Sequence, residues 1–247
     1  MHNSLKEKFH ILWNRFFDNA ELPIILYYTD KKTVKENDPE KSSYCLIACL
    51  NRVRKGTSLR FNTHSIGCPG GKRYAGYNPE ISENFEHFLS SGIPDVMEGE
   101  RYKQSPELVK NWIEDAPRFR ASSSQIVFKR WDHIDEDDDP EVVIFFARPD
   151  VLSGLFTLAN YDLMYEGVTA PFGSGCSSII MYPVLEGEKE HPRCVFGMFD
   201  PSARPYVEPD TLTFAVPMKR FTQMVENMEE SFLITPTWDA IKKRLKP

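Results

Sequence analysis

Strand-like and helical hydrophobic patterns follow one another irregularly along this chain, and this order constrains its fold more than any other feature. Short apolar runs rich in β-branched and aromatic residues predict strands at 22–28, 57–61, 125–131, 141–147, 193–199 and 211–216. Apolar residues at helical spacing predict helices at 5–17, 43–55, 85–89, 151–159 and 218–228, and Ser105 before Pro106 predicts the start of another. Ser42 or Ser43 can cap the helix at 43–55, and a polar surface link is predicted at 30–41. Because strands and helices do not alternate regularly, we expect an α+β fold with a mixed or antiparallel sheet and packed helices.

The two halves of the chain share a rough order of elements. Each contains a helix, an extended segment, a glycine-bracketed cysteine and a short helix. Such an order is compatible with a degenerate internal duplication. With 247 residues the chain is long enough to bury a substantial core, and we expect one domain over 1–247 with helices at both ends.

Charge and composition exclude several classes of protein. A net charge of -6 argues against general binding to nucleic-acid phosphates. The charged N-terminal residues do not resemble a secretory signal, and no apolar run approaches the length of a membrane span. The five cysteines are widely spaced and odd in number, which fits a reducing compartment. We therefore expect a cytoplasmic protein that binds neither nucleic acid nor membrane.

Two cysteines lie in glycine-rich runs that each predict a turn from a loop into a helix. Cys68 stands in Ser-Ile-Gly-Cys-Pro-Gly-Gly at 65–71, and Cys176 stands in Phe-Gly-Ser-Gly-Cys-Ser-Ser at 172–178. Glycine allows the sharp bend and the close approach of a bound group. Pro69 is favoured in the first turn of a helix, because its missing N–H is not needed there. These two loops are the predicted site.

Several motifs together resemble domain of unknown function family 169. The first are Cys45 before an apolar helix, Gly56, and the Gly-Cys-Pro-Gly-Gly run with Gly-Tyr at 76–77. Further motifs are Ala-Arg-Pro-Asp at 147–150, the loop at 173–182, Met-Phe-Asp-Pro-Ser-Ala-Arg-Pro at 198–205 and the strand at 212–217. The resemblance implies a single family domain with its core at about 22–228, mainly in prokaryotic cytoplasm, and it supplies no established activity. Cys49 and Cys194 fit the family pattern least.

The preferred interpretation of the cysteines is a metal centre or an iron–sulfur cluster. Thiolates are soft ligands that suit zinc and iron–sulfur clusters, and the trio Cys45, Cys68 and Cys176 would supply them, with Cys49 as a fourth. No Cys-x-x-Cys pair occurs, however, and typical cluster motifs place ligands within a few residues of one another. Free cysteines also pack in cores as small hydrophobes, so an interaction module with structural cysteines remains open.

A second interpretation makes the same loops a site for a small anionic metabolite, in a binding protein or an enzyme. Backbone N–H groups, glycines and cations suit phosphate or carboxylate. The ligand-binding candidates are Gly67, Gly70, Gly71, Lys72, Arg73, Gly173, Ser174, Gly175, Ser177 and Ser178. Neither run matches the Walker or dinucleotide pattern.

A third interpretation makes Cys68 or Cys176 a nucleophile. A helix start lowers a thiol pKa, and His64 is the nearest base in the sequence to Cys68. Two other patterns have structural explanations: the acidic run 135–139 predicts a solvated hairpin tip between two strands, and Asp200 with Arg204 predicts a turn held by their contact.

Overall fold

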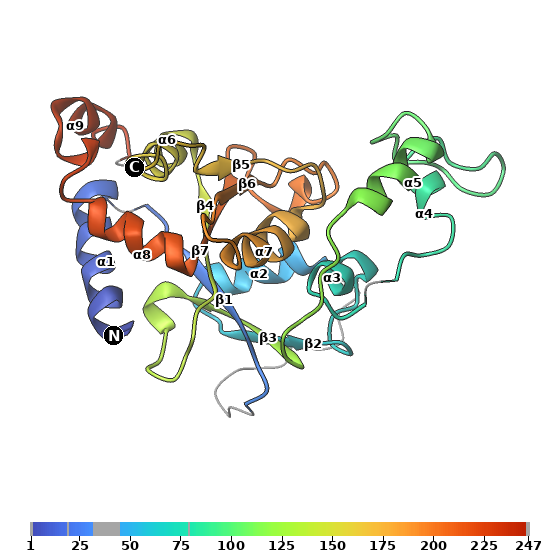
Figure 1. Ribbon diagram of the computed structural model, residues 1–247, viewed down its shortest axis with the longest axis horizontal. Helices are drawn as coiled ribbons and strands as arrows, with labels where there is room; N and C mark the ends of the chain where they lie inside the picture. The colour runs from blue at the N-terminus through green and yellow to red at the C-terminus, as the bar shows by residue number, and fades with distance from the viewer. Residues whose placement is uncertain (1, 19, 32–44, 79, 246–247) are drawn as a thin grey trace.

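The computed structural model describes residues 2–18, 20–31, 45–78 and 80–245, which form a central sheet with helices on both faces (Figure 1). The helices are α1 His2–Phe17, α2 Leu46–Arg54, α3 Pro69–Tyr74, α4 Phe85–Phe88, α5 Pro106–Asp115, α6 Pro149–Leu158, α7 Tyr182–Gly187, α8 Met218–Asn227 and α9 Pro236–Lys242. The strands are β1 Ile24–Thr29, β2 Leu59–Asn62, β3 Gln125–Arg130, β4 Val142–Ala147, β5 Val168–Thr169, β6 Cys194–Gly197 and β7 Leu212–Pro217. The α+β expectation is confirmed.

In the described part of the chain the strands form one seven-stranded sheet in the order β2-β3-β1-β4-β7-β6-β5. All neighbours are antiparallel except β5 and β6, so the sheet is mixed. The hairpin expected between β3 and β4 is wrong, because β1 lies between them and pairs with both. The hairpin is predicted because the two apolar runs follow one another in the sequence. The sequence pattern does not show that β1, from far earlier in the chain, is inserted between them.

Side chains of the central strands alternate between two cores. Ile25 and Tyr27 of β1 point to one core, and Ile24, Leu26 and Tyr28 point to the other. Both sets are buried, so residues 24–28 are apolar without interruption. A strand of this kind needs packed elements on both faces of the sheet. Figure 1 shows these layers, with α1, α8 and α9 on one side of the sheet and α2, α3 and α7 on the other.

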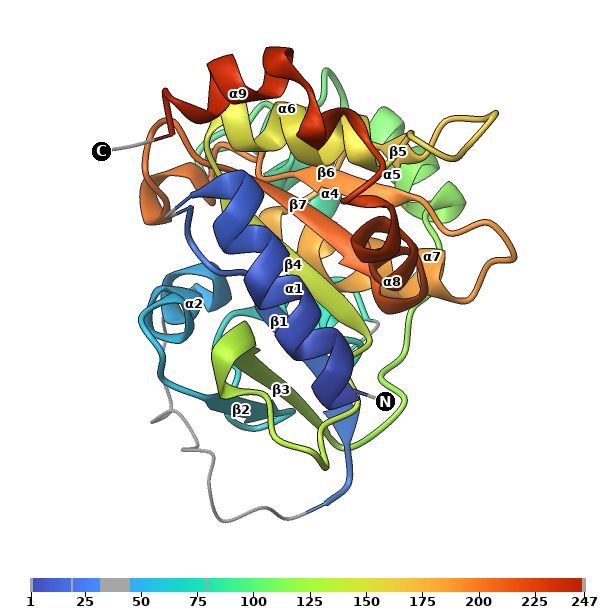
Figure 2. The ribbon, with the colours of Figure 1, turned by 90° about the vertical axis from the view of Figure 1, so that its left-hand side faces the viewer.

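The tryptophan face, as we name it, is the side of the sheet covered by α1, α6, α8 and α9 (Figure 2). Three almost fully buried tryptophans, Trp13, Trp131 and Trp238, lie in its core. The rings of Trp13 and Phe17 stack with centroids 4.3 Å apart. Helix α6 comes so close that a Cβ on Gly154 would lie 2.4 Å from the Trp238 ring. This face is closed by tight aromatic packing.

The glycine-loop face is the opposite side, covered by α2, α3, α7 and a π-helical turn at Ser177–Met181. Leu46, Ile47, Leu50 and Val53 bury one side of α2 against the strands. The helix ends as expected before Gly56, whose φ of +100° favours glycine. Ser42 and Ser43, expected to cap this helix, lie outside the described residues, as does most of the polar link predicted at 30–41.

Helices α4 and α5 belong to a segment, 78–118, inserted between α3 and β3. Figure 1 shows both helices at the end of the molecule beyond α3, away from the tryptophan face. Helix α5 begins as predicted, with the Ser105 hydroxyl accepting the N–H of Leu108 at 3.3 Å ahead of Pro106. The segment therefore adds a wall beyond the glycine-loop face.

The acidic run between β3 and β4 is exposed as expected at 135–137 and at Asp139, but the solvated tip expected there is wrong for Asp138. Asp138 is only 6% exposed and accepts two hydrogen bonds from Lys129, at 3.0 and 2.9 Å. It also accepts the Tyr27 hydroxyl at 2.5 Å. Lys129 is itself 2% exposed, so each charge requires the other.

The internal duplication stays a prediction. The helix after β1, α2, packs on the glycine-loop face, whereas the helix after β4, α6, packs on the tryptophan face. The two halves therefore do not repeat each other face by face. Among the described residues, no helix combines the length and apolarity needed to cross a bilayer.

Candidate functional site

A cavity of about 890 Å³ opens where the glycine-loop face meets the inserted segment 78–118. Its walls come from five parts of the chain: the start of α2, the first cysteine loop with α3, the inserted segment, the second cysteine loop and residues 197–203. This volume is in the range of sites for small organic ligands. The two predicted loops therefore do converge, although about a hundred residues separate them in the sequence.

Cys68 caps the start of α3, as the Gly-Cys-Pro-Gly-Gly run predicts. Its sulfur accepts the backbone N–H of Gly71 at 3.4 Å, and Pro69 takes the first helical position. A Cβ on Gly71 would lie 3.1 Å from the Ile66 side chain, so this glycine allows the helix to pack closely. A Cβ on Gly70 would meet only the Cys68 sulfur, at 3.8 Å. Gly70 thus leaves the cavity open without being required for packing.

The second loop is held more tightly than the first. A Cβ on Gly175 would lie 2.8 Å from the Ala203 Cβ and 3.0 Å from the Met198 sulfur. The Ser178 hydroxyl donates to the Gly175 carbonyl at 2.9 Å and accepts the Met198 N–H at 3.4 Å. The chain then enters the π-helical turn, a rare conformation that is frequent at functional sites.

Asp200 positions this second loop, a role that the sequence analysis missed. One of its carboxylate oxygens accepts the Gly175 N–H at 3.1 Å, and the other accepts the Ser202 N–H at 3.0 Å. The Ser202 hydroxyl donates to both oxygens. The Asp-Pro-Ser turn was the available signal, but its partner Gly175 lies too far back in the sequence to be found by spacing.

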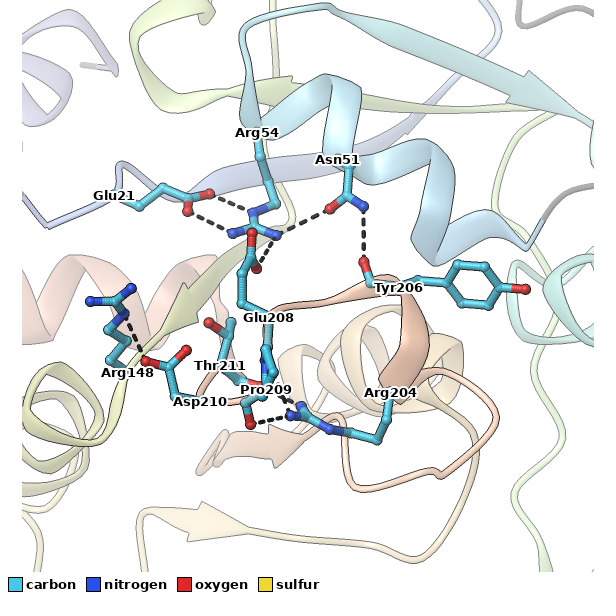
Figure 3. Close-up of polar contacts among 10 residues, drawn as sticks. All are labelled: Glu21, Asn51, Arg54, Arg148, Arg204, Tyr206, Glu208, Pro209, Asp210 and Thr211. Carbon is cyan, nitrogen blue, oxygen red and sulfur yellow. Dashed lines mark hydrogen bonds and ion pairs between the residues drawn. The ribbon is translucent and has the colours of Figure 1, made fainter.

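Asp200 and Arg204 meet through the backbone, where the Arg204 N–H donates to the Asp200 carbonyl at 3.2 Å, while the Arg204 side chain is bound elsewhere (Figure 3). Its guanidinium donates to the carbonyl oxygens of Thr211, Glu208 and Pro209. These bonds stabilise the segment that follows the cavity wall. Its turn is thus held by a guanidinium bound to backbone oxygens.

Arg54 at the end of α2 ties the same segment to the body of the protein (Figure 3). It donates to both carboxylate oxygens of Glu21, at 2.6 and 2.8 Å, and to Glu208 at 3.0 Å. Its guanidinium also lies 4.7 Å from the centre of the Phe146 ring. Although the two carboxylates are partly exposed, the bidentate geometry favours a fixed orientation. Arg54 thereby helps to hold the 197–211 region in place.

Met198, in the cavity wall formed by residues 197–203, has a backbone conformation that bulky residues avoid. Its φ is +69°, and the residue is 1% exposed. A left-handed conformation costs a non-glycine residue about 1 kcal/mol or more. Such strain concentrates at functional sites, where the surrounding packing maintains it.

The inserted segment contacts the opposite wall through two aromatic residues. Tyr102 lies beside Glu100 and Ser202, and its pKa is raised to about 12 by burial and by Glu100. Trp112 places its ring edge-on against Phe172, with centroids 5.5 Å apart. Lys103 lies over the same Phe172 ring, 4.2 Å from its centre. These contacts close the cavity on the side of the insertion.

Cys45, Cys68 and Cys176, the predicted metal ligands, all line the cavity. Burial raises the pKa of the Cys176 thiol well above its usual range, and the neighbouring Cys45 and Cys68 add to this shift. Burial also raises the pKa of Cys45. The expectation that a helix start lowers the pKa of Cys176 is therefore wrong, because loss of solvation outweighs it.

The geometry does not favour a metal centre. Among the residues that the structure describes, no group of three or more His, Cys, Asp and Glu side chains is arranged to hold a metal ion. Thiols with raised pKa values also bind metal less readily, since the thiolate is the ligand. Metal or cluster binding by Cys45, Cys68 and Cys176 remains a prediction without support from this geometry.

Most of the predicted anion-binding residues line the cavity, but its charge is opposite to the one expected. Seven of the ten are in its walls: Gly70, Gly71, Arg73, Gly173, Ser174, Gly175 and Ser178. The other three, Gly67, Lys72 and Ser177, are not among its lining residues, and neither is His64, which is exposed. Within the described lining, Arg73 is the only basic side chain, against the carboxylates of Glu80, Glu83, Glu100 and Asp200.

One comparison with known proteins gives a match. The family model for DUF169, described as uncharacterised ArCR, matches residues 16–227. No curated protein and no solved structure matches the chain. The matched range includes every wall of the cavity.

Proposed function

The chain belongs to the DUF169 family, which is described as uncharacterised, so we propose a function from the cavity alone. We propose that the protein binds a small organic molecule between its two glycine loops and the 78–118 segment. The observation that carries this proposal is the cavity itself, with its volume of about 890 Å³ and its largely apolar and aromatic walls. Ligand sites combine such walls with a few placed polar groups. Here those polar groups are the serines of the second cysteine loop and, from residues 197–203, Asp200 and Ser202.

The way the walls are built supports the proposal. Asp200, Ser178 and Ser202 use their hydrogen bonds to fix backbone around the cavity. Met198 keeps a strained backbone in the same wall. A surface hollow without a role does not require such support, whereas a binding site gains from fixed geometry.

The cysteines fit a supporting role in this site. Cys176 is buried, and the raised pKa keeps its thiol protonated at neutral pH. In the described residues no disulfide joins any of the five cysteines, which agrees with a reducing compartment, and we place the protein in the cytoplasm. We assign the thiols of Cys45 and Cys176 to the cavity floor as small polarisable contacts.

A pair of glycine substitutions tests the proposal. Gly70→Leu points a side chain into the cavity, and its Cβ meets only the Cys68 sulfur at 3.8 Å. Leucine also favours the helical conformation over glycine by about 0.8 kcal/mol, so the variant should fold. Gly187→Leu is the matched control, because a Cβ there meets only Pro217 at 3.6 Å and the position lies outside the cavity.

The measurement is a thermal-shift screen of a metabolite library against both variants and the wild type. We expect ligands that raise the Tm of the wild type and of Gly187→Leu but not that of Gly70→Leu. If every stabilising compound acts equally on Gly70→Leu, the cavity is not the binding site. A screen of the wild type without any stabilising compound likewise contradicts the proposal.

A further inference from the structure

Resting on the proposed function, we infer that the cavity selects organic cations: a flat apolar or aromatic group that carries an amine. The sequence pattern favours the opposite charge, since it places Lys72 and Arg73 beside a glycine loop. The structure keeps only Arg73 in the lining. Three observations carry the inference: aromatic walls, surrounding carboxylates and an ammonium group already placed on one of the rings.

Aromatic rings line the cavity from both sides. The inserted segment contributes Phe85, Phe88 and Trp112, and the body contributes Tyr74, Phe172 and Phe199. The face of an aromatic ring carries negative potential and attracts ammonium groups while it also binds flat apolar surface. The same wall therefore serves both parts of the expected ligand.

The carboxylates of the lining add negative electrostatic potential, which also favours a positively charged ligand. Asp200 is buried, at 9% exposed, whereas Glu80, Glu83 and Glu100 are exposed at the rim. Solvent screens the exposed three, so we expect them to affect selectivity and association more than total affinity. Asp200 acts at closer range, although its oxygens already hold Gly175 and Ser202.

The side-chain ammonium of Lys103 already contacts one of the aromatic rings that line the cavity. The Lys103 Nζ lies 4.2 Å from the centre of the Phe172 ring, and Trp112 packs edge-on against the same ring. This contact is a cation–π interaction within the protein, and it occupies one face of the Phe172 ring. We expect the ligand's amine to find the same interaction on the other rings of the cavity.

Matched probes separate charge from shape. Calorimetry on the full chain compares phenethylamine with 3-phenylpropionate, tryptamine with indole-3-propionate, and 2-(1-naphthyl)ethylamine with 3-(1-naphthyl)propionate. Each pair keeps the ring and the two-carbon spacer and exchanges ammonium for carboxylate. We expect the amine of at least one pair to bind about tenfold more tightly than its carboxylate. Carboxylates that bind equally or more tightly, or amines that do not bind at all, would overturn the inference.

Substitutions of the exposed carboxylates at the cavity rim test whether these charges cause the preference for amines. Glu83→Gln with Glu100→Gln should weaken amine binding about threefold, since each removes one exposed charge. Glu98→Gln is the matched control, because Glu98 is exposed in the same segment but does not line the cavity. If the control weakens amine binding as much as the double variant, the lining carboxylates are not the cause and the inference fails.

The two proposals can fail separately. Library ligands that Gly70→Leu abolishes but that are anionic or uncharged would leave the binding site in place and reject only its preference for cations. Amine binding that survives in Gly70→Leu would reject both, since the amine would then lie outside the cavity.

Discussion

The two faces of the sheet use the same strands for opposite purposes. On the tryptophan face, helices α1, α6, α8 and α9 bring large aromatic side chains together until no room for a side chain remains at Gly154. On the glycine-loop face, short helical elements follow glycine-rich loops and leave a cavity of about 890 Å³. Both faces bury a large core, but the tryptophan face is filled throughout, whereas the glycine-loop face also leaves room for a ligand. Four predictions test this division.

The largest expected effect is on the tryptophan face. Trp13 is 1% exposed, stacks on Phe17 and donates its indole N–H to the Ala20 carbonyl at 3.1 Å. Trp13→Ala should lower the free energy of unfolding by about 4 kcal/mol, through lost packing and a new cavity. Urea denaturation measures this, with Ile11→Ala on the same helix, 66% exposed, as the control. A loss no larger than that of the control would contradict the division.

The buried ion pair at the end of β3 should have the next largest effect. Asp138→Ala leaves Lys129 buried without its main carboxylate partner, which should cost about 3 kcal/mol of unfolding free energy. Asp137→Ala removes an exposed charge of the same loop and should have almost no effect. Equal losses for the two variants would show that Asp138 behaves as the solvated tip that the sequence predicts.

The two cysteine loops should differ in reactivity. Cys176 is buried with a raised pKa, whereas Cys68 is half-buried at the cavity. At pH 7.5 iodoacetamide should modify Cys68 roughly tenfold faster than Cys176, because the thiolate is the reacting form and access is required. Peptide mass mapping over time gives both rates. Cys194, buried with a pKa of about 12, is the internal reference for a slow thiol.

The smallest expected effect is at the contact across the cavity. Tyr102→Phe removes the hydroxyl beside Glu100 and Ser202 and should cost less than about 1 kcal/mol of unfolding free energy. Hydrogen exchange should still become faster in 80–102, because the inserted segment loses a contact to the body.

The same tyrosine predicts a pH dependence. Because its pKa is raised to about 12 in the folded protein, its contribution to stability is complete below the usual value of about 10. It is lost as the pH rises from there through 12. In Tyr102→Phe this part of the alkaline destabilisation should disappear, and an unchanged pH profile would contradict the assignment.

Local patterns in the sequence predict the elements well but not their arrangement. Pro69 and Ser105 mark the starts of α3 and α5, and Gly56 marks the end of α2, because capping depends on neighbouring residues. The position of β1 between β3 and β4 depends on distant pairing, which spacing does not show. For the same reason the acidic run looked solvated although Asp138 meets Lys129.

The candidate site shows the same limit. The glycines around Cys68 and before Cys176 indicated two loops, and the structure brings both loops to one cavity, where close packing at Gly71 and Gly175 requires glycine. Three of the four lining carboxylates and part of the aromatic lining come from the inserted segment, whose patterns carry no chemical signature of their own. The sequence therefore predicted the floor of the cavity and missed its charge and its opposite wall.

Hydrogen exchange with and without a stabilising ligand tests the division between the two faces most directly. The account predicts that the ligand slows exchange together in 68–74, 80–102, 173–178 and 197–203, and that α1 and α9 on the tryptophan face do not change. Protection confined to the tryptophan face, or to only one of the two cysteine loops, would contradict it.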